Sequence, residues 1–288
     1  MSRSTNTLAG DAESQFSVQI LLATESMTLR DVVCRGECKH KSPEECSRTT
    51  HLVFPYRGVY VRHLGQDEAV AEANQVLFFN AGESYCVSHP VTGGDASLSL
   101  SINEELLREL TPKAQLQQGS PLAYRQQRLR IDARTQALAA LLAHSGRTRT
   151  AEPLESEALV LTLVRRALGE RTSHAAGATF GRQKLVDRAK LILSSDIRRR
   201  WTLAEIGAEL RVSPVYLTQA FSQVEGMPLY RYQLRLRLAS ALDLLGQYDD
   251  LTALGMDLGF SSHSHFTAAF RQTYGRTPAE FRRAARIR

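Results

Sequence analysis

The sequence lacks the long apolar segments and the abundant cysteines that mark membrane and disulfide-rich proteins. No run of about 18 apolar residues occurs, and the polar start MSRSTNTLAGDAES lacks the apolar stretch of a secretory signal. Four cysteines in 288 residues are too few for a disulfide framework. With 43% apolar and 23% charged residues, the chain is neither disordered nor collagenous. We expect a cytoplasmic protein with two domains and no membrane partner.

Positive charge is unevenly distributed along the chain. Residues 182–288 hold 17 basic and 10 acidic side chains, whereas residues 1–181 hold 19 and 20. A segment of about a hundred residues with this surplus can make many contacts with a polyanion, and nucleic acid is the first candidate. A solvated basic surface without a partner is the alternative.

The N-terminal half reads as an all-β unit. Short segments of strand-forming residues alternate with turn residues, at a spacing that favours a small barrel or sandwich over a βαβ sheet. A jelly-roll barrel of the cupin type fits this pattern. The predicted strands cover residues 29–34, 49–54, 57–63, 74–79 and 96–102.

Helical patterns follow the predicted strands. Asn103 is a candidate N-cap for a short helix that Pro112 stops. Two longer helices are predicted over 131–144 and 153–169, and they could form a packed pair or a dimer interface. In the second, one face is predicted to carry Leu154, Ala158, Leu161, Val164, Arg165 and Leu168.

These patterns predict an α+β protein with two domains. Residues 1–170 would form a cupin-like β-barrel domain with a helical dimerisation segment. Residues 171–181 are small, polar and without period, and we expect them to be a linker. Residues 182–288 would form an all-α domain.

The C-terminal hundred residues contain an internal repeat at an offset of 48 to 49 residues. Leu210, Val212-Ser213 and Phe221 in the first copy correspond to Leu258, Phe260 with Ser262, and Phe270 in the second. The offset changes at the turn, so the second copy has one extra turn residue. Each copy reads as a short helix, a tight turn and a Ser-capped second helix that ends at a glycine. This pattern predicts two helix-turn-helix units joined by a helix over 228–245.

The second helix of each copy presents polar residues away from its apolar face. Such a helix can reach the floor of a major groove, where Gln and His bond base edges and Thr or Val contacts a thymine methyl. An ordinary solvated helix face is the alternative for any one helix. The expected base-reading residues are Val215, Thr218, Gln219, His263, Ser264 and Thr267, and the expected phosphate contacts are Ser222, Arg271 and Arg276.

The segment LGMDLGFSSHSHFTAAFRQTYGRTPAEFRR resembles the signature of the AraC/XylS family of bacterial transcription regulators. The resemblance covers about 100 residues and includes IGAELRVSPVYLTQAF in the first copy. It implies a sequence-specific regulator, an activator, whose tandem units enter adjacent major grooves of promoter DNA and which contacts RNA polymerase. It also implies a homodimer, and an N-terminal cupin-like domain that binds a small effector. Ala268 and Gly255 depart from the family pattern, so the second unit is expected to read fewer bases.

The first half carries no pattern of catalytic ligands. A metal-dependent cupin needs an H-x-H and a distant third His, and residues 1–181 contain no H-x-H. We therefore expect no enzyme activity and no cofactor. The family resemblance implies an effector pocket, against the alternative of a filled core, and the expected lining is Phe54, Tyr60, Phe78, Tyr85 and His89.

A group of thiols and an imidazole, Cys34, Cys38, His40 and Cys46, falls within 13 residues. These are enough ligands for Zn²⁺ or a soft metal, although the spacing is not that of a standard zinc motif. A metal- or redox-sensing regulator is therefore an alternative. A more remote alternative is a DNA methylphosphotriester repair enzyme, which fuses a zinc-thiolate domain to the same kind of helix-turn-helix. Its C-x2-C half is absent here, and Cys86 stands alone.

Overall fold

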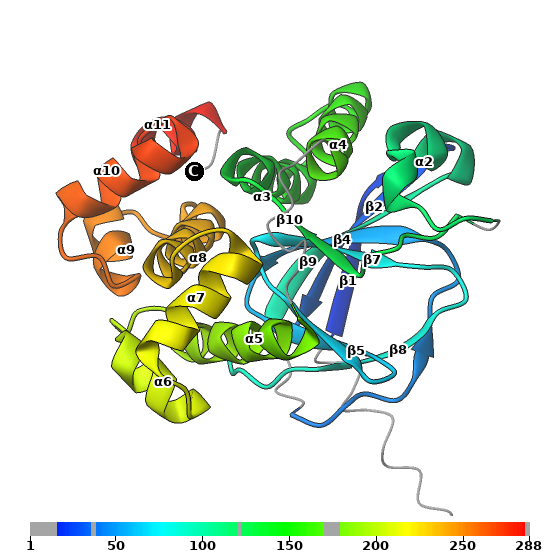
Figure 1. Ribbon diagram of the computed structural model, residues 1–288. Coiled ribbons are helices and arrows are strands. Elements are labelled where there is room, and N and C mark those ends of the chain that lie inside the picture. Colours follow the sequence, from blue (N-terminus) through cyan, green and yellow to red (C-terminus); the bar gives the residue numbers. More distant parts are fainter. Residues whose placement is uncertain (1–15, 36–38, 120–121, 170–178, 286–288) are drawn as a thin grey trace, which may run out of the picture.

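The computed structural model describes residues 16–35, 39–119, 122–169 and 179–285. It has a sheet-rich N-terminal part and a helical C-terminal part that lie side by side (Figure 1). The described residues include no helix that is long and apolar enough to cross a membrane.

The main sheet of the N-terminal part has six strands in the order β1-β2-β9-β4-β7-β10. All neighbouring pairs are antiparallel. One face of this sheet is covered by α2, α3 and α4 (Figure 1), and leucines such as Leu52, Leu98 and Leu100 are fully buried beneath these helices. The strands are β1 (Phe16–Ala23), β2 (Met27–Cys34), β4 (His51–Arg57), β7 (Gln75–Phe79), β9 (Asp95–Ile102) and β10 (Arg128–Arg130).

The second sheet has four strands in the order β3-β8-β5-β6 and packs against the uncovered face of the first. Its strands are β3 (Glu45–Cys46), β5 (Tyr60–Leu64), β6 (Asp67–Ala71) and β8 (Ser84–Ser88). We call the space between the two sheets the inter-sheet layer. Apolar residues from both sheets meet there in a cluster of Val53, Tyr60, Ala71, Leu77 and Phe79.

The strand prediction was right for five strands and missed others, among them the inner strand β8 of the second sheet. β2, β4, β5, β7 and β9 cover the predicted segments, but β6 lies partly in a segment read as a turn, and β1 was not predicted. Within the described residues the strands form two separate sheets, not one closed sheet. The cupin-like barrel therefore stays a prediction, while the α+β class and the division into a sheet-rich and a helical part are confirmed.

The helices of the first half begin close to the expected residues, but α3 ends at Thr148, four residues beyond its predicted end. The Asn103 side chain accepts a hydrogen bond from the Leu106 N–H at 3.0 Å and caps α2 (Glu104–Leu110). Asp132 caps α3 (Ala133–Thr148), and Pro153 is the first residue of α4 (Pro153–Leu168). A short 3₁₀ turn, η1 (Lys113–Gln115), follows α2. α3 and α4 pack together, which agrees with the expectation that the two helices form a packed pair.

The predicted apolar face of α4 was partly wrong. Leu154 is 78% exposed, and Ala158 and Arg165 are also exposed. The buried face is turned by about one residue along the helix, because the sheet below contacts Val160, Leu163, Val164, Ala167 and Leu168. Periodicity identified the helix but not which of its two apolar edges faces the core.

The C-terminal part consists of seven helices within residues 180–284. α5 (Phe180–Ser195) precedes the first helix pair, α6 (Leu203–Leu210) and α7 (Pro214–Glu225). α8 (Leu229–Leu244) leads to the second pair, α9 (Leu251–Asp257) and α10 (His263–Tyr274), and α11 (Pro278–Ala284) follows. Residues 171–178 of the predicted linker lie outside the described residues, and residues 180–181 form the start of α5.

Candidate nucleic-acid interface

The two helix pairs have the local structure that the repeat predicts. Ser213 caps α7 by accepting from the Tyr216 N–H at 3.2 Å, and Ser262 caps α10 by accepting from the His265 N–H at 3.1 Å. Both helices end at a glycine in the left-handed region, Gly226 at φ 62° and Gly275 at φ 79°. The same stop and start residues therefore give both units a second helix of 12 residues.

The turns explain the change of offset in the repeat. In the first unit Arg211 takes the left-handed conformation at φ 59°, and in the second Gly259 takes it at φ 80°. After this shared position, the first turn reaches its cap Ser213 through one residue, whereas the second reaches Ser262 through two. The extra residue is Ser261, whose hydroxyl lies 3.0 Å from His265 Nδ1.

The inner faces of α7 and α10 are buried as predicted. Leu217, Ala220, Phe221 and Val224 of α7 are at most 5% exposed, and Phe266 and Phe270 of α10 are fully buried. Each unit has its own core: α5 and α6 close around α7, and α8 and α9 close around α10. Only Tyr274 remains half-buried among the predicted core positions.

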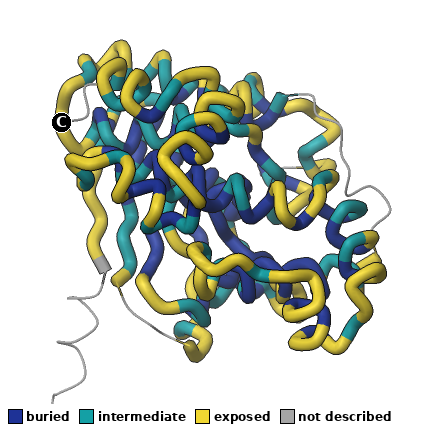
Figure 2. The backbone as a smooth tube through the Cα atoms, turned by 90° about the vertical axis from the view of Figure 1, so that its left-hand side faces the viewer, coloured by how far each residue is buried: buried dark blue, intermediate teal, exposed yellow. Residues whose placement is uncertain are grey.

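The opposite faces lie at the surface. Val215 is 66% exposed, Gln219 is exposed and Thr218 is half-buried. In the second unit His263 and Ser264 are exposed and Thr267 is half-buried. The expected phosphate contacts Arg271 and Arg276 are exposed, and Ser222 is half-buried. Figure 2 views the molecule from this helical side and shows exposed segments alternating with buried ones along the chain.

Local hydrogen bonds limit what some of these side chains can offer. The Thr218 hydroxyl donates to the Pro214 carbonyl at 2.8 Å, so its methyl group is what remains for an outside partner. His263 lies between two hydroxyls, with Nδ1 3.4 Å from Thr252 Oγ1 and Nε2 3.3 Å from Thr267 Oγ1. Gln219 has no such local role in the described contacts and keeps both its donor and its acceptor.

A surface groove runs along α10. It is lined by His263, Ser264, Thr267, Ala268, Arg271, Gln272, Gly275 and Thr277. The short side chain of Ala268 lies in this lining, at the position where the sequence departs from the family pattern. The groove therefore has polar walls and a basic end, but it lacks a long side chain at its middle.

The charges at the surface are predominantly basic. Lys190 and Arg237 are buried and bonded inside the protein, but most other basic residues of this part are exposed. The guanidinium of Arg199 stacks on Trp201 at 4.0 Å and pairs with Glu205 at 2.7 Å. The exposed set is Lys184, Arg188, Arg198, Arg199, Arg200, Arg211, Arg231, Arg271, Arg276 and Arg283.

Sequence reasoning missed two residues at this surface. Tyr216 is 41% exposed beside Val215, and the guanidinium of Arg182 on α5 lies 6.0 Å from its ring. Arg182 also donates to Gln223 of α7. The repeat could not indicate them, because Tyr216 has His265 at its equivalent position and α5 has no counterpart in the second copy.

Arg237 of α8 joins the two units. Its guanidinium donates to the backbone carbonyls of Ile197, Arg198 and Arg199 before the first unit, and to that of Gly259 in the turn of the second. Four carbonyl acceptors from two separate segments satisfy one buried side chain. The connector is therefore fixed to both units by hydrogen bonds as well as by apolar packing.

The N-terminal part packs directly against both units. Arg128 of β10 donates to Asp187 of α5 at 2.6 Å, and Glu72 lies 3.9 Å from Lys190 Nζ. Farther along, Arg57 of β4 pairs with Asp243 of α8 at 3.6 Å. The Tyr274 hydroxyl of α10 lies 3.5 Å from Gln136 Oε1 of α3. Ion pairs and hydrogen bonds thus connect the sheet-rich part to α5, α8 and α10.

The residues expected to form an effector pocket lie in two different layers. Phe54 and Phe78 are buried under the helices on the outer face of the main sheet, where Phe78 stacks on Tyr124 at 4.0 Å. Tyr60 and Tyr85 lie in the inter-sheet layer, and the Tyr60 and His89 ring centroids are 6.2 Å apart. The structure does not bring all five around one space, because Phe54 and Phe78 face the helices on the main sheet, whereas Tyr60 and Tyr85 face the inter-sheet layer.

The cysteine-rich segment does not gather as its spacing suggested. Cys46 is exposed on β3, with its thiol 3.9 Å from the Ser47 carbonyl, and His40 is exposed in the preceding loop. Cys38 lies outside the described residues. Cys34, at the end of β2, instead lies beside two residues that are distant in sequence, His89 and Asp95.

Comparison with known proteins places the C-terminal part among helix-turn-helix regulators. Residues 206–284 match a family described as a helix-turn-helix domain. The chain is 34% identical over 91 residues to the regulatory protein PocR of Salmonella typhimurium, which covers 31% of this chain and 29% of PocR. It is 28% identical over 143 residues to the transcriptional regulator GadX of Escherichia coli, which covers 49% of this chain and 52% of GadX.

A solved structure is also among the similar proteins. The chain is 30% identical to an AraC-type transcriptional regulator from Chromobacterium violaceum, with a TM-score of 0.35 over 37% of this chain and 96% of that one. The chain spans about half the length, or less, of the curated relatives it matches. The curated relatives are named as regulators, in agreement with the expectation that the chain is not an enzyme.

Proposed function

Residues 206–284 are a helix-turn-helix domain of the AraC type, and from this premise we propose that the chain is a sequence-specific regulator of transcription. The observation that carries the proposal is the duplicated unit: α7 and α10 have the same caps, the same buried inner face and an exposed outer face within a basic domain. Two solvated helix faces of this kind suit two successive major grooves.

The outer faces suggest a role for each side chain. The exposed Val215 and the methyl group of Thr218 would contact thymine methyls, and Gln219 would bond a base edge through its amide. His263, Ser264 and Thr267 would read the second groove. Ser222, Arg271 and Arg276 would bind phosphates. Ala268 leaves the middle of α10 without a long side chain, so we expect the first unit to supply more of the sequence specificity.

The connector suits simultaneous binding by both units. Successive major-groove segments on one face of B-DNA lie about 34 Å apart. The 16 residues of α8 span about 24 Å, and parts of each unit add to that length. Arg237 fixes the helix to the segment before the first unit and to the turn of the second. We therefore expect one protein chain to cover two adjacent groove segments.

The N-terminal part would regulate this binding in the cytoplasm by sensing a small effector. Direct contacts of β4, β10 and α3 with α8, α5 and α10 support such coupling, because an effector that moves these elements must also disturb the DNA-binding units. Tyr60, Tyr85 and His89 in the inter-sheet layer are the remaining pocket candidates.

The exposed Leu154 edge of α4 is the candidate for homodimer contact. Activation through RNA polymerase is part of the same proposal.

A selection from a pool of random DNA duplexes tests the proposed function. The full chain should enrich sequences that share two short motifs about 10 to 10.5 base pairs apart, centre to centre. Gln219→Ala should relax one position of the first motif and leave the second unchanged. Recovery of sequences with no common motif would overturn the proposal.

A further inference from the structure

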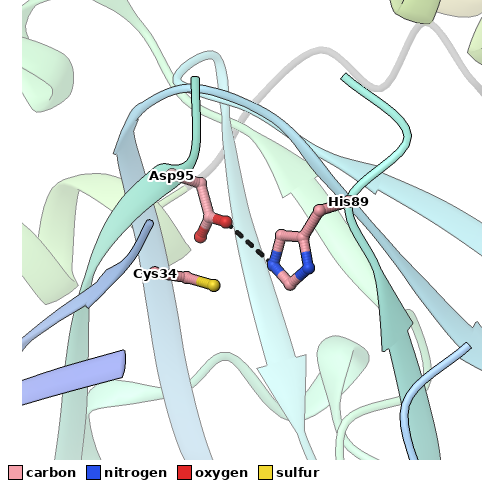
Figure 3. A group of neighbouring side chains, drawn as sticks. All are labelled: Cys34, His89 and Asp95. Carbon is pink, nitrogen blue, oxygen red and sulfur yellow. Dashed lines mark ion pairs between the residues drawn. The ribbon is translucent and has the colours of Figure 1, made fainter. Parts of the chain in front are cut away.

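Three side chains from different strands of the N-terminal part converge at one end of the inter-sheet layer (Figure 3). Cys34 is the last residue of β2, Asp95 is the first residue of β9, and His89 directly follows β8. The β2–β9 register pairs Cys34 with Asp95. A thiol sulfur, an imidazole nitrogen and a carboxylate oxygen of the three residues all lie within 4.8 Å of one another.

The strands approach closely here because of two glycines. Gly94 has φ 69°, and a Cβ on it would lie 2.3 Å from the Cys34 carbonyl oxygen. Gly58 has φ 68°, and a Cβ on it would lie 2.1 Å from the Gly94 carbonyl oxygen. Both positions exclude any side chain, since real Cβ atoms do not come so close to backbone. The backbone thus holds Cys34 and Asp95 together independently of any attraction between their side chains.

The Asp95 carboxylate is buried, and among the described residues its Oδ2 has no partner other than the ion-pair contact with His89. Asp95 is 7% exposed and His89 is 9% exposed. The His89 Nε2 lies 2.9 Å from Asp95 Oδ2 as an ion-pair contact, but within the described residues this oxygen accepts no hydrogen bond. A buried carboxylate oxygen left in this state is costly unless a cation compensates it.

We propose that Cys34, His89 and Asp95 bind one divalent transition-metal ion of the zinc class. Thiolate, imidazole and carboxylate are the three ligand types that Zn²⁺ accepts, at about 2.3, 2.0 to 2.1 and 2.0 to 2.2 Å. Those bond lengths place ligand atoms roughly 3.3 to 3.6 Å apart in a tetrahedral site. The three atoms already lie within 4.8 Å of one another, and three protein ligands would leave the fourth position for water or another small ligand.

The composition of the site disfavours Ca²⁺ and Mg²⁺. Ca²⁺ and Mg²⁺ require a set of oxygen ligands, and this group offers one carboxylate. The thiolate and imidazole favour zinc and its neighbours in the first transition series. The site differs from the one that the cysteine spacing suggested, because Cys46 and His40 are exposed elsewhere and only Cys34 is shared.

Titration with Co²⁺ tests the site, because a Co²⁺–thiolate bond gives a charge-transfer absorption that reports coordination by sulfur. The full chain is stripped of metal, reduced and titrated with Co²⁺ alone. We expect one equivalent to bind, a thiolate band to appear and Zn²⁺ to displace it. Cys34→Ser should abolish the band, and Asp95→Asn should weaken binding by about tenfold or more.

Two matched variants make the assignment to Cys34 specific. Cys46→Ser removes an exposed thiol of the same segment and should leave the titration unchanged. A chain with Cys38→Ser, Cys46→Ser and Cys86→Ser keeps Cys34 as its only cysteine and should retain the band. Each variant is compared with the parent by thermal unfolding, so that misfolding is not read as lost binding. Absence of the band in the parent or in the Cys34-only chain, or its persistence in Cys34→Ser, would overturn the proposal.

Discussion

Lys190 Nζ of α5 lies 2.5 Å from Glu225 Oε1. Glu225 is the last residue of α7, the helix whose outer face is exposed in the first unit. Both side chains are almost completely buried. Two further carboxylates lie 3.9 Å from Lys190 Nζ, that of Asp187 on α5 and that of Glu72 in the N-terminal part. A single buried ammonium group therefore lies between a carboxylate of the DNA-binding unit and one of the sheet-rich part. Any movement that separates the two parts changes the surroundings of α7.

Removing one partner of this pair should be costly. Glu225→Gln leaves the Lys190 charge buried without its closest counter-ion, which we expect to lower the free energy of unfolding by about 3 to 5 kcal/mol. The double variant Lys190→Met with Glu225→Leu removes both charges and should cost much less than Glu225→Gln alone. Urea denaturation of the three chains measures the difference. Equal losses in the single and double variants would contradict the pairing.

The two carboxyl groups should respond to pH in opposite directions. Burial would raise the pKa of Glu225, but Lys190, Arg128 and Arg130 outweigh it and hold that pKa below its ordinary 4.5. Burial raises the pKa of Glu72 above 4.5, and the more distant Lys190 only reduces this shift. The stability contributed by Glu225 is thus present above about pH 4.5 and is lost as the pH falls through its depressed pKa. The contribution of Glu72 is present at low pH and is lost as the pH rises through its raised pKa.

Glu72→Gln should therefore be tolerated where Glu225→Gln is not. Glu72 Oε2 accepts a hydrogen bond from the Asn74 N–H at 2.6 Å, and the amide oxygen of glutamine can accept the same bond. The substitution also removes the cost of ionising a buried carboxyl group. As the pH is raised from 5 to 8, we expect the melting temperature of Glu72→Gln to fall less than that of the parent chain. If Glu72 were instead the ionised partner of Lys190, Glu72→Gln would melt at a lower temperature than the parent across the whole range, with an unchanged pH dependence.

Gly259 should be far less replaceable than Gly275. Both have positive φ, at 80° and 79°, but a Cβ on Gly259 would lie 2.3 Å from the Arg198 carbonyl oxygen, whereas nothing lies within 4 Å of one on Gly275. Gly275→Ala should cost about 1 to 2 kcal/mol for its conformation alone, and Gly259→Ala about 1 to 3 kcal/mol more. Equal melting temperatures for the two variants would show that the turn can move away from Arg198.

Gln219 and Arg271 should affect DNA binding in different ways. Gln219→Ala should lose about 1 to 3 kcal/mol of discrimination at one base position, because a base-edge contact is sequence-specific. Arg271→Ala should weaken binding to all duplexes alike and reduce the salt dependence of binding, because a phosphate contact does not depend on the base sequence. Fluorescence anisotropy with the selected duplex and its point variants separates the two patterns. If Gln219→Ala weakened binding to all duplexes alike, Gln219 would be assigned to a contact with the DNA backbone instead of a base.

The C-terminal elements were predictable because their signals are local. Each second helix begins at a serine cap and ends at a glycine, namely Ser213 with Gly226 and Ser262 with Gly275. Because the same signals occur in both copies of the repeat, each copy supported the helix predicted in the other. The contacts of Lys190 with Glu72 and of Cys34 with His89 and Asp95 were not predictable. They join residues far apart in sequence, and a buried lysine has no pattern of its own. The exposed edge of α4 at Leu154 was misread for a related reason, since two apolar edges of one helix are equivalent until its neighbours are known.

The ratio of affinities for a selected duplex and a scrambled duplex of the same length tests sequence-specific recognition most directly. It is measured with the full chain at physiological salt, and again at higher salt. We predict a ratio of at least about 10³, with both affinities falling steeply as salt increases, because bound phosphates release counterions. A ratio near one at physiological salt would contradict the account, since the basic surface would then bind DNA without reading it.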